Sequence, residues 1–142
     1  MVRRYESDSW YWPKLRNMAD AAQAANGGFW AAIICAAFTA VFATISLFTK
    51  SSIAGIDAAA YIDAVLFAII AWRIRRRSKA FAIIGLCLFV IEKIHQYATQ
   101  PSLAVFGIFM TVILLLAFIN GVRGTFAFHR LSALALAAPQ DA

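Results

Sequence analysis

Four long apolar stretches, separated by short polar segments, dominate the pattern of this chain. They cover residues 27–49, 56–74, 80–98 and 103–123. A helix rises about 1.5 Å per residue, so about 20 apolar residues cross the roughly 30 Å of hydrocarbon in a bilayer. The pattern therefore predicts an all-α fold, an integral membrane four-helix bundle.

The four predicted spans divide the chain into three parts. Residues 1–26 have the composition of a soluble segment, residues 27–124 form the predicted membrane domain, and residues 125–142 form an alanine-rich tail. We expect this tail to be cytoplasmic and to end as a short helix on the membrane surface. A chain of 142 residues holds four spans and little else, so we expect one folded domain.

Aromatic residues cluster in the N-terminal part, at Trp10, Tyr11 and Trp12. Amphipathic rings favour the headgroup level of a membrane. We therefore predict that residues 14–25 form an interfacial helix that leads into the first span. The alternative is a loose tail whose aromatic side chains bind a partner.

Composition agrees with a membrane protein. Apolar residues make up 63% of the chain and charged residues 14%, whereas soluble domains have about 25% charged residues. The net charge of +6 lies at the ends of the apolar stretches and not along one soluble face. We therefore expect anionic membrane lipids, and not nucleic acid, as the partner of this charge.

The basic residues also predict the orientation. The turn between the second and third stretches carries five of them, and lysine and arginine in short loops stay on the cytoplasmic side. With both termini inside as well, eleven of the 13 lysine and arginine residues are cytoplasmic. This predicts an inner-membrane protein with cytoplasmic N and C termini. The predicted contacts with lipid headgroups are Trp10, Trp12, Arg73, Arg75, Arg76, Arg77, Lys79 and Arg123.

Ionisable residues interrupt the second and third predicted spans. Asp63 lies about 10 Å below the outer end of its span, and Glu92 and Lys93 lie about 8 to 9 Å below theirs. Equal depth on neighbouring helices predicts an ion pair between Asp63 and Lys93, which leaves Glu92 facing a cavity, water or a second subunit. The predicted intramembrane polar cluster comprises Asp57, Asp63, Glu92, Lys93, His95 and Gln96.

Ionisable residues inside a membrane usually mark a functional site. The alternative here is structural, with Asp63 and Lys93 as a satisfied pair while Glu92 and His95 reach the outer interface. Both interpretations stay open at this point.

The known sequence signatures of catalytic and cofactor sites are missing or incomplete in this chain, which argues against an enzyme. Glu92-x-x-His95 has the spacing of di-iron bundles, but those sites need a second such motif and further carboxylates. His95 and His129 belong to opposite membrane faces and cannot share one haem. No phosphate-binding glycine loop, nucleophile elbow or paired-cysteine zinc motif occurs. We predict a non-enzymatic protein without cofactor or metal; a membrane-embedded acid or base at Glu92 is the alternative.

Small residues recur every four positions in the first two stretches and predict that these two helices lie against each other. They are Ala32, Ala36 and Ala40, followed by Ala43, in the first stretch, and Ala60, Ala64 and Ala68 in the second. The two cysteines lie in the middle of apolar runs, where a thiol behaves as a small hydrophobe. We therefore expect no disulfide between them.

Three segments resemble a group of small bacterial four-span inner-membrane proteins of unknown function. They are Ile-Asp-Ala-Val-Leu-Phe at 62–67, Arg-Arg-Arg-Ser-Lys-Ala at 75–80, and the Arg-Gly-Thr-Phe segment within 120–129. The resemblance covers residues 53–131 and implies a bacterial inner-membrane location. Asp63 and Arg123 match the pattern of the group.

These observations predict a channel or transport-type protein for a small solute or ion. Four thin helices enclose little volume, so a conduction path requires a homo-oligomer. The alternative is an accessory or scaffold subunit that docks a larger membrane complex through its alanine stripes and residues 10–12.

Overall fold

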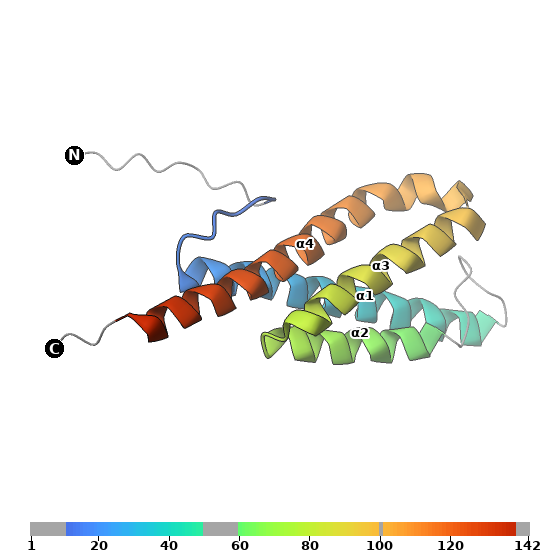
Figure 1. Ribbon diagram of the computed structural model, residues 1–142. Coiled ribbons are helices and arrows are strands. Elements are labelled where there is room, and N and C mark those ends of the chain that lie inside the picture. The colour runs from blue at the N-terminus through green and yellow to red at the C-terminus, as the bar shows by residue number, and fades with distance from the viewer. Residues whose placement is uncertain (1–10, 50–59, 100, 139–142) are drawn as a thin grey trace.

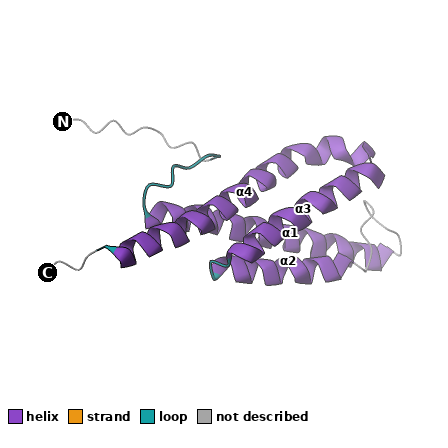
Figure 2. Ribbon diagram, in the orientation of Figure 1, coloured by secondary structure: helices purple, strands orange, loops and turns teal. Residues whose placement is uncertain are grey.

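A computed structural model describes residues 11–49, 60–99 and 101–138, and no strand occurs among them. The described residues form four helices: α1 (Met18–Thr49), α2 (Ala60–Arg75), α3 (Lys79–Thr99) and α4 (Pro101–Ala137) (Figure 1). The described loops are the segment before α1, the turn between α2 and α3, and the end after α4 (Figure 2). The predicted all-α fold is confirmed.

Three of the helices in the described residues are long and apolar enough to cross a membrane. They are α1, α3 and the part of α4 from Gly107 to Ala137. Helix α2 has 16 residues in the described part of the chain, which is about 24 Å of helix. The finding supports a membrane protein, and the count of four spans stays a prediction.

Helix α1 begins at Met18 because the residue before it caps its first turn. The Asn17 Oδ1 accepts a hydrogen bond from the Asp20 amide at 2.8 Å, and Asp20 Oδ2 accepts one from the Arg16 amide at 3.3 Å. These bonds satisfy amides that a helix start leaves unpaired. The predicted helix over residues 14–25 is confirmed for residues 18–25, which form the start of α1, and is wrong for residues 14–17, which are not helical. Its interfacial position stays a prediction.

Helix α4 runs without a break from Pro101 to Ala137, a length of about 55 Å. The expected span ended at residue 123, with a separate short helix in the tail. The difference arises at Gly121 and Gly124, which do not end the helix. Both are buried against α1, and their packing outweighs the poor helix propensity of glycine.

The backbones of α1 and α4 touch where Gly121 faces Gly28 and Gly124 faces Ala25. A methyl group added at Gly28 would lie 2.8 Å from the Gly121 Cα, and one added at Gly124 would collide with the backbone of Ala25. Only glycine allows this approach. The α1–α4 pair is the most extensive helix contact in the described residues. The α1 side of the contact region is made of small buried residues: Ala21, Ala24, Ala25, Gly28, Ala31 and Ala32.

Three fully buried phenylalanines fill the centre of the bundle. Phe67 of α2 and Phe89 of α3 both pack on Phe118 of α4, with ring centroids 6.3 and 5.2 Å apart. Dispersion contacts between these rings stabilise the helix packing, and such contacts act in lipid as well, where the hydrophobic effect does not drive helices together. The same rings occupy the space between α2, α3 and α4.

The predicted packing of the first two helices is confirmed. Helices α1 and α2 form the second most extensive pair, and Ala32, Ala43 and Ala64 of the alanine stripes are buried. Ala68 is exposed. The buried members of the stripes are used inside the chain and are not open to a partner.

Away from the glycine contact, the helices separate into two pairs. Figure 1 shows α3 and α4 diverging from α1 and α2 toward the end that holds Thr49 and Thr99. The hydroxyls of Thr44 and Tyr61 hydrogen-bond across α1 and α2. Tyr97 donates to the Thr111 Oγ1 at 2.9 Å across α3 and α4. Each pair thus has its own tyrosine–threonine link.

Candidate functional site

The polar residues of α2 and α3 form the candidate site. Asp63 lies in the first described turn of α2, and Glu92, Lys93 and Gln96 lie in the second half of α3; all four are half-buried. Their positions on α3 follow from helical periodicity, since residues three and four apart share one face. His95 is exposed. Asp57 lies outside the described residues.

The structure does not form the predicted pair between Asp63 and Lys93. The Lys93 Nζ donates to the Gln96 Oε1 at 2.9 Å and lies 5.6 Å from the centre of the Phe89 ring. Gln96 is one turn away on the same helix, so this bond costs less conformational entropy than a bond to a residue of another helix. The equal depth of the two residues stays a prediction, whereas the predicted pair is wrong because a partner on its own helix satisfies the lysine.

Glu92 is the residue of this site that the fold leaves unsatisfied. Its Oε1 is buried and has no hydrogen-bond partner among the described residues. Asp63 and Lys93 both act on its charge, and the buried Cys35 of α1 lies within the electrostatic reach of Glu92 and Lys93. Residues of three helices thus lie within electrostatic reach of one carboxyl group whose buried oxygen has no partner, which is costly unless a proton or a cation reaches it.

The described residues contain no group of three or more histidine, cysteine or acidic side chains that could hold a metal ion. Glu92 and His95 do not come together as ligands, because His95 is exposed while the Glu92 Oε1 is buried. Both cysteines are free thiols, with Cys35 buried and Cys87 exposed. The chemistry open to the site is binding of a proton or a small cation by carboxylates.

The predicted headgroup contacts gather at the opposite end of the bundle, where most of them lie over aromatic rings. The Arg123 guanidinium is 3.8 Å from the centre of the Trp12 ring, and Asn120 Nδ2 donates to the Tyr11 carbonyl at 2.9 Å. The N-terminal aromatic segment thus lies on α4. Trp10 is outside the described residues. The other cation–ring pairs are Arg73 with Phe81, Arg75 with Phe29, Arg76 with Trp72, Arg77 with Phe128, and Lys79 with Phe126.

Arg77 connects three helices, a role that sequence reasoning missed. Its φ of 61° places it in the left-handed position that closes α2, where glycine is usual. The bonds from the Arg77 amide to the Ile74 carbonyl, 2.8 Å, and from the Ser78 amide to the Arg73 carbonyl, 3.2 Å, complete a Schellman turn. The only sequence signal for this role is that the short turn Arg76-Arg77-Ser78 contains no glycine or asparagine, so another residue type has to adopt the left-handed conformation.

The Arg77 side chain explains why arginine stands at this strained position. Its Nη1 donates to the Ala22 carbonyl of α1 at 2.8 Å, and its guanidinium lies 5.0 Å from the Phe128 ring of α4. His129 of α4 donates from Nε2 to the Arg77 carbonyl at 2.7 Å. Burial lowers the pKa of Arg77, but arginine stays charged in proteins.

Comparison of the chain with protein-family models, curated proteins and solved structures finds no match. The resemblance to small four-span inner-membrane proteins therefore stays a prediction.

Proposed function

We propose that this chain is a small non-enzymatic inner-membrane protein of the transport type, which moves a proton or small cation and works as an oligomer. The observation that carries the proposal is the buried, unpaired Oε1 of Glu92. A carboxyl group in this setting either keeps a proton or takes up a cation, because an isolated buried charge is costly.

The neighbours of Glu92 make it suited to exchange. Asp63 of α2 and Lys93 of α3 both lie within electrostatic reach of its carboxyl group. Because Asp63 and Glu92 belong to different helices, movement of α2 relative to α3 changes the distance between the two carboxyl groups. Cys35 contributes a buried free thiol from α1.

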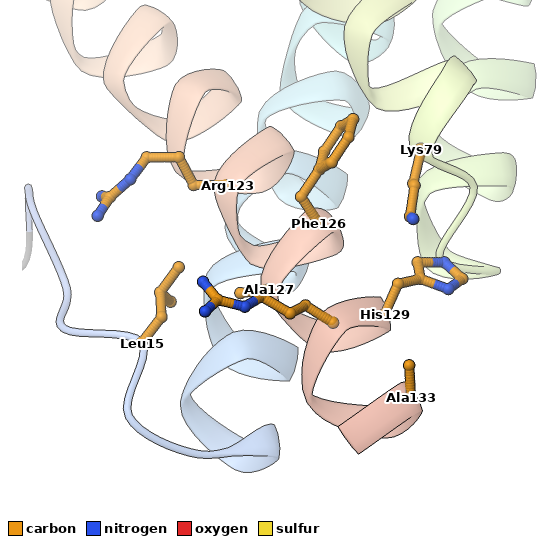
Figure 3. A pocket seen from close by; sticks show the side chains of 8 residues that line it. Leu15, Lys79, Arg123, Phe126, Ala127, His129 and Ala133 are labelled. Carbon is orange, nitrogen blue, oxygen red and sulfur yellow. The ribbon is translucent and has the colours of Figure 1, made fainter. Parts of the chain in front are cut away.

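The proposed topology has four spans and both termini in the cytoplasm. It is supported by the gathering of Lys79, Arg123 and His129 at one end of the bundle (Figure 3), together with the Arg73 to Arg77 turn. Lysine and arginine gathered at one end of the bundle match the positive-inside rule. Glu92 then lies in the outer half of the membrane.

An oligomer is proposed because the centre of one chain is filled. Phe67, Phe89 and Phe118 are fully buried between α2, α3 and α4. A path for an ion therefore lies beside this layer, between copies of the chain. The accessory-subunit alternative has less support, since Ala32, Ala43 and Ala64 of the stripes it required for docking are buried within the chain.

Reconstitution into liposomes tests the function. Proton and monovalent-cation flux is measured for the wild type, for Glu92→Gln and for Glu92→Asp. We expect the glutamine variant to lose flux and the aspartate variant to keep part of it. Asp20→Asn is the matched control, because it removes one negative charge at the opposite end of the molecule and should leave flux unchanged.

Equal flux in the wild type and Glu92→Gln would contradict the role of Glu92. Absence of flux for every ion tested, with stoichiometric partner proteins recovered in a mild-detergent pull-down, would favour the accessory subunit instead. Cross-linking in lipid nanodiscs gives the oligomeric state independently of flux.

A further inference from the structure

An open groove of about 660 Å³ lies at the basic end of the bundle. Three parts of the chain that are distant in sequence line this groove: the irregular segment before α1, the first residue of α3, and the second half of α4. Figure 3 shows Leu15, Lys79 and Arg123 around the same hollow, with Phe126 between the two basic residues. The lining residues are Leu15, Lys79, Arg123, Phe126, Ala127, His129, Arg130 and Ala133.

The charge of the groove has one sign. Lys79, Arg123, His129 and Arg130 line it, and no acidic side chain of the described residues does. Arg130 has no hydrogen-bond or ion-pair partner among the described residues, and Lys79 contacts only the Phe126 ring, 5.4 Å away. These two cations are exposed and uncompensated by the rest of the chain, so the groove attracts an anion.

The remaining lining is apolar. Leu15, Phe126, Ala127 and Ala133 cover the groove between and beside the cations, and Phe126 is 43% exposed. A free inorganic ion would leave these surfaces in water, whereas an amphipathic anion covers them. Pockets of this volume are the usual size for small-molecule sites.

We infer that this groove binds the phosphate headgroup of an anionic glycerophospholipid, with the first part of an acyl chain against Phe126 and Leu15. The groove lies at the end that carries the Arg73 to Lys79 turn, which the proposed topology puts at the lipid headgroups of the cytoplasmic leaflet. The inference concerns binding alone and does not depend on ion transport through Glu92.

Native mass spectrometry of the full chain in neutral detergent tests the inference. Phosphatidylglycerol and phosphatidylcholine are added at equal concentration, and retained lipid is counted for the wild type and two double variants. Lys79→Gln/Arg130→Gln removes two cations from the groove. Lys14→Gln/Arg16→Gln is the matched control, since it removes two exposed cations that neither line the groove nor belong to the predicted headgroup contacts.

We expect one phosphatidylglycerol to bind saturably to the wild type and to the control variant. The groove variant should bind it about twenty-fivefold more weakly, about fivefold for each cation removed. Equal weakening in the two variants would mean general charge attraction and would overturn the inference. Binding of phosphatidylcholine as tight as that of phosphatidylglycerol would overturn it as well.

Inorganic phosphate is the third arm, because a soluble phosphate ester shares the chemistry of the headgroup. Millimolar phosphate should leave lipid retention unchanged; full displacement would assign the groove to a soluble anion and contradict the lipid. Thermal melts check that the variants fold. Should the double variant melt earlier than the wild type, Arg130→Gln alone gives the same comparison, with about fivefold weaker binding expected.

Discussion

At the basic end of the bundle, glycines bring the backbones of α1 and α4 into contact, whereas at the opposite end the helices meet through tyrosine and threonine hydroxyls. Gly28, Gly121 and Gly124 leave no room for even a methyl group. The links Thr44–Tyr61 and Tyr97–Thr111 each join two neighbouring helices and leave the two pairs separate.

This difference places rigidity and freedom in different parts of the molecule. Close backbone packing has one favourable arrangement, so the basic end resists deformation. At the opposite end the two helix pairs diverge, so further separation there costs less free energy than at the glycine contact. Glu92 and Asp63 lie on α3 and α2, one in each pair, and separation of the pairs would therefore change the distance between the two carboxyl groups.

The largest expected effect is the loss of stability on filling the glycine contact. Gly121→Ala places a methyl group 2.5 Å from the Gly28 Cα, so one helix must shift. We expect a cost of about 1 to 3 kcal/mol in a thermal melt in detergent. Gly107→Ala is the control, because its new methyl group meets nothing within 4 Å and should stabilise α4 by about 0.5 to 1 kcal/mol. Equal melting temperatures for the two variants would contradict the close contact.

The Arg77 turn predicts a difference between two substitutions that both remove the side chain. Arg77→Gly and Arg77→Ala each lose the bond to the Ala22 carbonyl, but glycine tolerates the φ of 61° and alanine does not. We expect Arg77→Gly to be the more stable of the two by about 1 to 2 kcal/mol in free energy of unfolding. An alanine variant as stable as the glycine variant would mean that residue 77 does not hold a left-handed conformation.

Smaller effects are expected at the hydroxyl links. Tyr61→Phe and Tyr97→Phe should each destabilise by about 0.6 kcal/mol, the usual value of a hydrogen bond between membrane helices. Because the two links belong to different helix pairs, the double variant should be additive within about 0.5 kcal/mol. A larger coupling energy would show that the two pairs are not separate.

The smallest expected value is the coupling between Asp63 and Lys93. Since Lys93 donates to Gln96, the double variant Asp63→Asn/Lys93→Met should be additive with its single variants within about 0.5 kcal/mol. A coupling of about 3 to 5 kcal/mol, the range expected when one partner of a buried ion pair is removed, would restore the pair that depth alone predicted.

Much of the fold was predictable from periodicity and span length. The third predicted span, 80–98, matches α3 within one residue at each end, because Ser78 precedes it and Pro101 follows it. The end of α4 was not predictable. Gly121 and Gly124 indicate a helix end when only local propensity is considered. Their partners, Gly28 and Ala25, are more than ninety residues away in the sequence, and only the folded chain brings them near.

The sequence indicated the residues of the candidate site but not their bonds, and their depth in a membrane stays a prediction. Helical spacing placed Glu92, Lys93 and Gln96 on neighbouring positions, yet it could not decide whether Lys93 turns to Asp63 or to Gln96. That choice depends on side-chain rotamers and on the separation of two helices. Arg77 was missed because an arginine at a helix end is usually interpreted as a charge and not as a left-handed cap.

Cysteine labelling in intact cells tests most directly the central claim that the basic end faces the cytoplasm and the opposite end faces outward. Cysteines are introduced singly, as Ser78→Cys in the basic turn and Ser102→Cys near the start of α4, after Cys35 and Cys87 have been replaced by alanine. A membrane-impermeant maleimide should modify position 102 and spare position 78 until the cells are broken. Labelling of position 78 but not 102 in intact cells would contradict the orientation and the proposed depth of Glu92.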